Sequence, residues 1–311
     1  MENYLLIALM IVISTAQSIL SRFYSTSYPG REDLSSPVFT IVSGFTLALC
    51  TFILGAFQFE ATLPTLILGT VNAFVLVLFN TSMLRASATG PYSITVVFMI
   101  AGGIIIPAAV AFCFGDTEGF WVKALAIIGV LVSVYLISRK EGEVYTNKKV
   151  FYLSCVGLAI GNGIYGSILD VHQRLTTPEG LTSTPEREEI LILTYFGAAL
   201  LSLLLLILKE KKNAVLAMKQ SRRSLAFLLS ASVIITAAVN LVVYTLGMID
   251  TTILFTLDNS CVFLLSVLFS CLVFREKLTK MNAIGCVSLC VALVCMSLSP
   301  SIAGWIEGLF V

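Results

Sequence analysis

The sequence is poor in charged residues. Only 12% of its 311 residues are Asp, Glu, Lys or Arg, whereas 58% are hydrophobic, and there is a single histidine. Soluble domains carry about 25% charged residues, so this composition excludes an ordinary soluble enzyme and indicates a polytopic membrane protein. The formal net charge of +1 gives no information about acidic partners. We expect the protein to bind no nucleic acid.

Motifs for nucleotide, metal and redox chemistry are also missing. No G-x-x-x-x-G-K-[ST] loop is present, so ATP is not expected to drive the protein directly. The eight cysteines fall within apolar runs, without a CxxC or other metal-ligand spacing. A G-x-G-x-x-G pattern occurs at Gly161–Gly166, but inside an apolar run rather than between a strand and a helix, as a dinucleotide site requires. We therefore expect no cofactor, no metal and no enzymatic activity.

Ten apolar runs fill most of the chain, each close to the roughly 20 residues that a helix needs to cross a bilayer. The connections between them are short and leave no room for a soluble domain. The sequence therefore predicts an all-α integral membrane protein with ten transmembrane helices. The runs are 4–22, 36–57, 63–85, 91–114, 121–138, 150–171, 190–208, 225–248, 252–274 and 281–299.

Lysine and arginine are concentrated in every second loop. Nearly all of them follow the first, third, fifth, seventh and ninth runs, while the other loops hold only Lys123, Arg174 and Arg187. Because cytoplasmic loops are enriched in Lys and Arg, this distribution places both termini outside the cytoplasm. We expect a multi-pass protein of the plasma (inner) membrane, with the lipid bilayer as its surroundings.

The two halves of the chain end in similar ways. Run 91–114 leads into Gly115-Asp116 and then a helix with Ile128-Gly129, and run 252–274 leads into Arg275-Glu276 and then a helix with Ile284-Gly285. Two repeats of five spans would be inverted relative to each other, which is typical of secondary transporters. The predicted division is 1–140 for the first repeat, 141–149 for a cytoplasmic linker, 150–299 for the second repeat and 300–311 for a short C-terminal tail.

An acid-amide pair, Asp258-Asn259, lies inside the ninth run. At the helical rise it is roughly 12 Å from the start of that run. A carboxylate inside a bilayer costs roughly 2.5–3.5 kcal/mol, so Asp258 is expected to face a cavity, unless it lies close enough to the membrane surface to be solvated. In a cavity it would bind a substrate cation or exchange a proton.

Other polar side chains recur on single faces of apolar runs. Asn240 and Tyr244, for example, are four residues apart and share a helix face. Two hypotheses fit such side chains: they line a cavity, or they form hydrogen bonds between packed helices. The candidate substrate-binding residues are Gln17, Asn72, Asn80, Tyr92, Asn162, Tyr165, Asn240, Tyr244, Thr256, Asp258 and Asn259.

The fourth run contains Gly102-Gly103 and, four residues later, Pro107. Proline inside a helix produces a kink, and neighbouring glycines ease bending. These three residues are candidate hinge or gating positions, and the alternative is a static kink.

The layout resembles the drug/metabolite transporter superfamily, in its ten-helix EamA-like branch. The resemblance rests on the acid-ended fourth and ninth helices, on the short basic turn VFREKLT at Val273–Thr279, and on the glycine in the last helix of each half. It implies that the first, third, fourth, sixth, eighth and ninth helices line a central cavity. It also implies that the fifth and tenth helices are peripheral and support a homodimer.

These observations favour a secondary active transporter that moves a small polar or amphipathic metabolite by alternating access. The candidate cavity residues include no Arg or Lys, which disfavours phosphorylated substrates and favours neutral or cationic amines, amino-acid-like or aromatic compounds. Two alternatives stay open: a lipid or drug flippase of the same fold, and an integral-membrane enzyme that uses Asp170 and His172.

Overall fold

The computed structural model describes residues 2–115, 119–138, 145–176, 186–246, 251–273 and 279–309. Every regular element among these residues is a helix. The elements are α1 (Glu2–Ser27), α2 (Glu32–Leu54), α3 (Leu63–Thr89), α4 (Tyr92–Cys113), α5 (Phe120–Ser138), α6 (Lys148–Leu175), α7 (Arg187–Glu210), the 3-10 turn η1 (Lys211–Asn213), α8 (Ala214–Ala217), α9 (Arg222–Leu246), α10 (Thr251–Leu272), α11 (Lys280–Ser297) and α12 (Ser299–Leu309).

Eight of these helices, α1 to α7 and α9, are long and apolar enough to cross a membrane. Large apolar side chains project from their outer faces, as for Leu5 on α1, Phe74 on α3 and Leu125 on α5. Such faces are unfavourable in water and favourable against lipid. The described chain is therefore all-helical and compatible with a multi-pass membrane protein.

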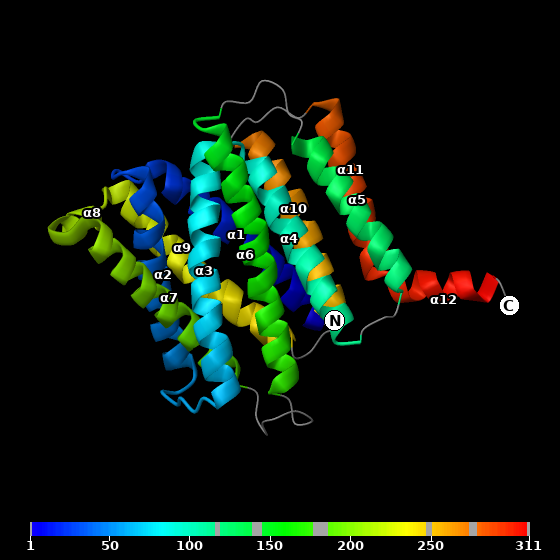
Figure 1. Cartoon of the computed structure of the whole chain (residues 1–311), viewed down its shortest axis with the longest axis horizontal. Coiled ribbons are helices and arrows are strands. Elements are labelled where there is room, and N and C mark those ends of the chain that lie inside the picture. Colours follow the sequence, from blue (N-terminus) through cyan, green and yellow to red (C-terminus); the bar gives the residue numbers. More distant parts are fainter. Residues whose placement is uncertain are drawn as a thin grey trace.

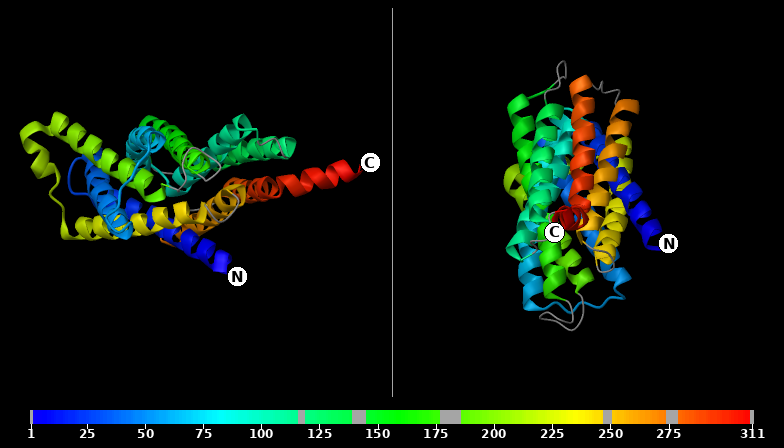
Figure 2. Two further views of the ribbon diagram at one scale, coloured as in Figure 1. Left: turned by 90° about the horizontal axis from the view of Figure 1, so that it is seen from below. Right: turned by 90° about the vertical axis from the view of Figure 1, so that its right-hand side faces the viewer.

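The helices form one bundle with two peripheral pairs (Figure 1). Helices α2 and α7 pack against each other on one side, and α5 and α11 pack against each other on the other side, from which α12 extends away (Figures 1 and 2). Between these pairs lie α1, α3, α4, α6, α9 and α10, with α3 against α6, α4 against α6, and α1 against α9 and α10. These six central helices, together with α7, surround the candidate site.

Helices α4 and α6 approach each other closely because glycines face each other across their contact. A Cβ atom at Gly102 would lie 1.9 Å from the carbonyl oxygen of Ala159, and one at Gly163 would lie 2.4 Å from the carbonyl oxygen of Gly102. Small residues of this kind allow close backbone contact between helices inside a membrane. Any side chain at Gly102 would therefore force α4 and α6 further apart.

Polar contacts tie α7 to the start of α2 at one end and to the start of α3 at the other. At one end, Asp33 pairs with Lys209 and with Arg31, and Arg31 also contacts Glu210 at 3.1 Å. At the other end, Oε2 of Glu186 accepts hydrogen bonds from the backbone N–H and the hydroxyl of Thr62, at 2.9 and 3.0 Å.

The second peripheral pair is tied together at the start of α11. Thr279 and Asn282 form a capping box there, in which each side chain accepts a hydrogen bond from the other residue's backbone N–H. The Asn282 amide also donates to the carbonyl oxygen of Ile137 at the end of α5, at 2.9 Å. One side chain thus caps α11 and links it to α5.

Candidate functional site

A cavity of about 150 Å³ lies in the middle of the bundle. Its walls come from seven helices, α1, α3, α4, α6, α7, α9 and α10. No Arg, Lys or His is among the described residues of these walls. They are Ser14, Gln17, Ser18, Leu76, Phe79, Met99, Gly103, Pro107, Asn162, Tyr165, Gly166, Leu169, Tyr195, Ala238, Val239, Val242, Asp258, Asn259 and Val262.

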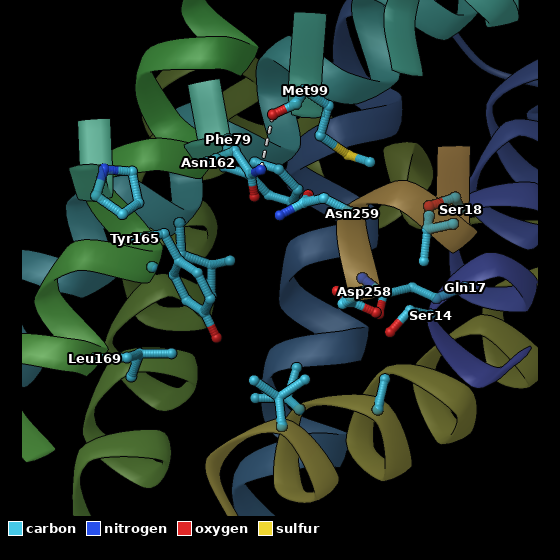
Figure 3. A pocket seen from close by; sticks show the side chains of 18 of the residues that line it. Ser14, Gln17, Ser18, Phe79, Met99, Asn162, Tyr165, Leu169, Asp258 and Asn259 are labelled. Atoms are coloured by element: carbon cyan, nitrogen blue, oxygen red, sulfur yellow. Dashed lines mark hydrogen bonds between the residues drawn. The ribbon is translucent and has the colours of Figure 1, made fainter. Parts of the chain in front are cut away.

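One wall of the cavity is acidic and polar. Asp258 of α10 faces Ser14 and Gln17 of α1 (Figure 3), and the Ser14 hydroxyl contacts the Asp258 carboxyl group. The Oδ1 atom of Asp258 is inaccessible to solvent and has no hydrogen-bond partner among the described residues. Asp258 is the one carboxylate in the described lining, and this oxygen is its unpartnered acceptor.

The amides of Asn162 and Asn259 occupy one end of the cavity, beside α4. Nδ2 of Asn162 donates to the carbonyl oxygen of Met99 at 2.9 Å. A Cβ atom at Gly103 would lie 2.6 Å from that nitrogen and 3.5 Å from Oδ1 of Asn259. Gly103 therefore leaves room for both amides, which come from α6 and α10 and point toward each other (Figure 3).

The wall across from Asp258 is aromatic. The hydroxyl groups of Tyr165 and Tyr195 lie 3.2 Å apart, and the Tyr165 ring stacks on Phe79 with a centroid distance of 6.5 Å. Tyr165 extends into the cavity on the side across from Asp258 (Figure 3). The cavity is thus bounded by a carboxylate on one side and by rings and hydroxyl groups on the other.

The structure gathers about half of the candidate binding side chains at this cavity. The predicted hinge residues Gly103 and Pro107 also line it, whereas Gly102 faces α6. The candidate substrate-binding residues in the cavity wall are Gln17, Asn162, Tyr165, Asp258 and Asn259.

Three other candidates lie outside the cavity wall. Asn80 donates to the hydroxyl of Thr40 at 3.1 Å and so links α3 to α2. Asn72 is fully buried on α3, and neither polar atom of its amide has a hydrogen-bond partner among the described residues. Tyr92 is buried at the start of α4, with the guanidinium of Arg22 5.2 Å from its ring centroid.

Asn240 and Tyr244 lie in a separate hollow between α1, α2, α7 and α9. Asn240 donates to the Thr51 hydroxyl on α2 at 3.0 Å, as expected of a side chain that links two helices. Tyr244 is about half exposed. The side chain of Thr256 lies outside the described part of the structure.

Asp170 and His172 do not form a shared site. Asp170 pairs with Arg174 of its own helix at 2.9 Å. Nε2 of His172 lies 2.8 Å from the Thr65 hydroxyl on α3. Each side chain therefore has a structural partner of its own, and no group of acidic, His and Cys residues in the described part of the chain could hold a metal.

The sequence alone did not identify Tyr195 or Phe79 as candidates. Both sit in predominantly apolar runs, where an aromatic side chain usually contributes to packing. The hydroxyl of Tyr195 in the middle of α7 was the available signal, because a buried phenol needs a hydrogen-bond partner. Ala238, Val239 and Val242 of α9 also line the cavity. Nothing in the sequence distinguishes them from the other apolar residues of their run.

Comparison with known proteins gives the fold and little else. No protein-family model matches the sequence, and no curated protein matches it. A solved structure described only as "Crystal structure of protein" is similar, with a TM-score of 0.58 over 96% of this chain and 99% of that chain, at 15% sequence identity. Similarity at this identity establishes a common fold and says nothing about function.

Proposed function

We propose that the protein is a secondary active transporter that moves a small polar or amphipathic metabolite, neutral or cationic, by alternating access. The observation that carries the proposal is the central cavity, enclosed by helices from both halves of the chain, with the carboxyl group of Asp258 in its wall. Secondary transporters typically bind substrate at the interface of two repeats near the middle of the membrane. Asp258 is the proposed coupling residue.

The pattern of helix contacts supports two repeats of five spans. If α1 to α5 are exchanged with α6, α7, α9, α10 and α11 in order, the pair α3–α6 becomes α9–α1, α4–α6 becomes α10–α1, and α3–α7 becomes α9–α2. All six of these pairs are in contact. The pairs α2–α7, α5–α11 and α4–α10, which map onto themselves, are in contact as well. We propose ten spans, an inverted repeat and membership of the superfamily that the sequence resembles.

The size and charge of the cavity favour a small substrate. Sites for drug-sized ligands occupy about 300–1,000 Å³, whereas this cavity is about 150 Å³. The described lining holds no cation that would pair with a phosphate. These features argue against a drug or lipid flippase, and the separate partners of Asp170 and His172 argue against an enzyme that uses both.

Transport is tested with purified protein in liposomes. Labelled amines, amino acids, nucleobases and vitamins are offered one at a time, and protein-free liposomes set the background. We expect uptake of at least one class and loss of that uptake in Asp258→Asn, with His172→Ala active. A complete absence of uptake and of ligand-induced thermal stabilisation across the panel would rule the proposal out. Loss of uptake in His172→Ala, with uptake kept in Asp258→Asn, would contradict the role given to Asp258.

A further inference from the structure

We propose that the central cavity selects a small organic monocation, a single ammonium group on an apolar body of about one ring, and rejects zwitterions and anions. The inference rests on the proposed transport function and narrows it, because amino acids and carboxylated metabolites fall outside it. The inference is argued from the charge of the cavity, from its volume, and from the contrast between its acidic wall and its aromatic wall.

The charge argument begins with Asp258. Its Oδ1 is enclosed and has no hydrogen-bond partner among the described residues. A carboxylate kept from water needs a cation or a proton to offset the loss of hydration. No described cavity residue is a cation, so the offset comes from a proton when no ligand is bound and, in the proposed complex, from an ammonium group of the ligand that replaces it. Such a charge-assisted hydrogen bond is roughly twice as strong as a neutral one.

The same inventory excludes a ligand carboxylate. A buried carboxylate needs charged donors or several well-placed N–H groups. The described lining supplies neutral donors only, and one of them, Nδ2 of Asn162, already donates to the Met99 carbonyl. A second carboxylate would also lie near Asp258 within one cavity of about 150 Å³, and like charges that close repel strongly.

The volume limits the body of the ligand. In another protein, an apolar cavity of about 150 Å³ takes up benzene, and this cavity has the same volume. One ring or a comparable aliphatic group with a short aminoalkyl chain is therefore the size that fits. Nucleosides and multi-ring drugs exceed it.

The aromatic wall favours a ring as that body. Phe79 and Tyr165 are stacked, and the Tyr165 and Tyr195 hydroxyl groups lie 3.2 Å apart, which fixes both phenols before any ligand enters. Rings held in this way offer an edge or a face to a ligand ring, while Asp258 takes the ammonium group across the cavity (Figure 3). The two walls thus separate the apolar end of a ligand from its charged end.

Four matched probes test the charge rule on the wild-type protein. The probes are 2-phenylethylamine, phenylalanine, 2-phenylethanol and 3-phenylpropanoate, and binding is measured by calorimetry in detergent. We expect the amine to bind at least about tenfold more tightly than each of the others, the ratio that corresponds to one charge-assisted hydrogen bond. Equal or tighter binding of phenylalanine or phenylpropanoate would overturn the inference, as would no binding of the amine.

Two variants then test whether the preference for the amine depends on the carboxyl group of Asp258 or on any carboxyl group of the protein. Asp258→Asn should lose the preference for the amine over 2-phenylethanol, and Glu60→Gln, at an exposed carboxyl group outside the cavity, should keep it. An unchanged preference in Asp258→Asn contradicts the proposal. If Asp258→Asn does not fold, the comparison of the four probes on the wild type still decides.

Failure of this inference is distinguishable from failure of the transport proposal. Uptake of an amino acid into liposomes together with weak binding of the amine would refute the monocation rule and leave a transporter in place. Absence of uptake and of thermal stabilisation by every compound of the broad panel would refute both.

Discussion

Two glycines on the facing helices α4 and α6 meet very different surroundings. A Cβ atom at Gly102 would collide with the backbone of Ala159 at 1.9 Å, whereas one at Gly166 would meet nothing within 4 Å. Gly102→Ala should therefore push the helices apart and lower the stability of the fold by about 1–3 kcal/mol, the usual cost of overpacking. The melting temperature of the purified protein checks this.

Gly166→Ala is the matched control for Gly102→Ala. It adds the same methyl group to a helix interior, where alanine is intrinsically favoured over glycine by up to about 1 kcal/mol. Its melting temperature should equal or exceed that of the wild type. A similar loss in both variants would show that the close approach at Gly102 does not limit packing.

Glu186 should make stability depend on pH. Burial raises the pKa of this carboxyl group, but hydrogen bonds from Thr65 and Thr62 outweigh it and hold the pKa below its ordinary value of 4.5. A carboxylate with a lowered folded-state pKa stabilises the fold above its unfolded pKa, and that stabilisation is lost as the pH falls through the folded value.

Glu186→Gln, which cannot ionise, reports that contribution. It should melt below the wild type at pH 7, by an amount equivalent to about 1 kcal/mol. The gap should close as the pH falls below about 4.5, where the wild-type carboxyl group takes up a proton. A gap of constant size down to the lowest pH at which the protein stays soluble would contradict the assignment.

At the scale of single residues, sequence pattern could not separate cavity residues from packing residues. Asn80, Asn162 and Asn240 are all amides in apolar runs, and each forms a hydrogen bond to another helix. Only Asn162 also borders the cavity. Which neighbour an amide meets depends on how its helix is rotated and on what packs beside it, and neither is encoded in local spacing.

At the scale of helices, Asn282 should matter more than an ordinary cap. It completes the capping box with Thr279 and also donates to the Ile137 carbonyl on α5. Asn282→Ala removes both functions and should destabilise the protein by about 1–3 kcal/mol. Thr279→Ala removes only the cap and should cost about 1 kcal/mol. Thermal unfolding ranks the two, and a larger loss in Thr279→Ala would contradict the link to α5.

The positions of the helices were largely predictable from the sequence. Each of the apolar runs coincides with a helix to within a few residues, as with run 63–85 and α3 at Leu63–Thr89. Hydrophobicity sets these positions, because an unpaired backbone cannot be exposed to lipid. The helical form of the tail, α12, was not predicted; it carries the exposed Trp305, a residue type enriched where proteins meet the membrane surface.

At the scale of the whole molecule, the sequence predicted which helices surround the centre, but it did so through a resemblance. Composition predicts where the spans lie and which loops are charged. Which helices are neighbours in the bundle depends on side-chain packing between segments that are far apart in the sequence. The contribution of α7 through Tyr195 was not expected. Nor could the spacing of residues give a cavity volume, which depends on all seven helices that enclose it.

The loop charges predict which end of the bundle faces the cytoplasm. The loop between α2 and α3 and the segment around α8 lie at opposite ends of the long helices (Figure 1), and the second of these is rich in Lys and Arg. Because Lys and Arg favour the cytoplasmic side, a cysteine at Glu60 should react with a membrane-impermeant maleimide in intact cells. A cysteine at Lys219 should react only after permeabilisation.

Both positions are exposed in the structure, so lack of labelling in intact cells reports the membrane barrier rather than burial. The wild-type protein sets the background, since its eight cysteines lie within apolar runs. Labelling of the cysteine at Lys219 alone would invert the orientation and keep the bundle. Labelling of both in intact cells would mean that the two ends do not lie on opposite sides of a membrane, which the alternating-access proposal requires.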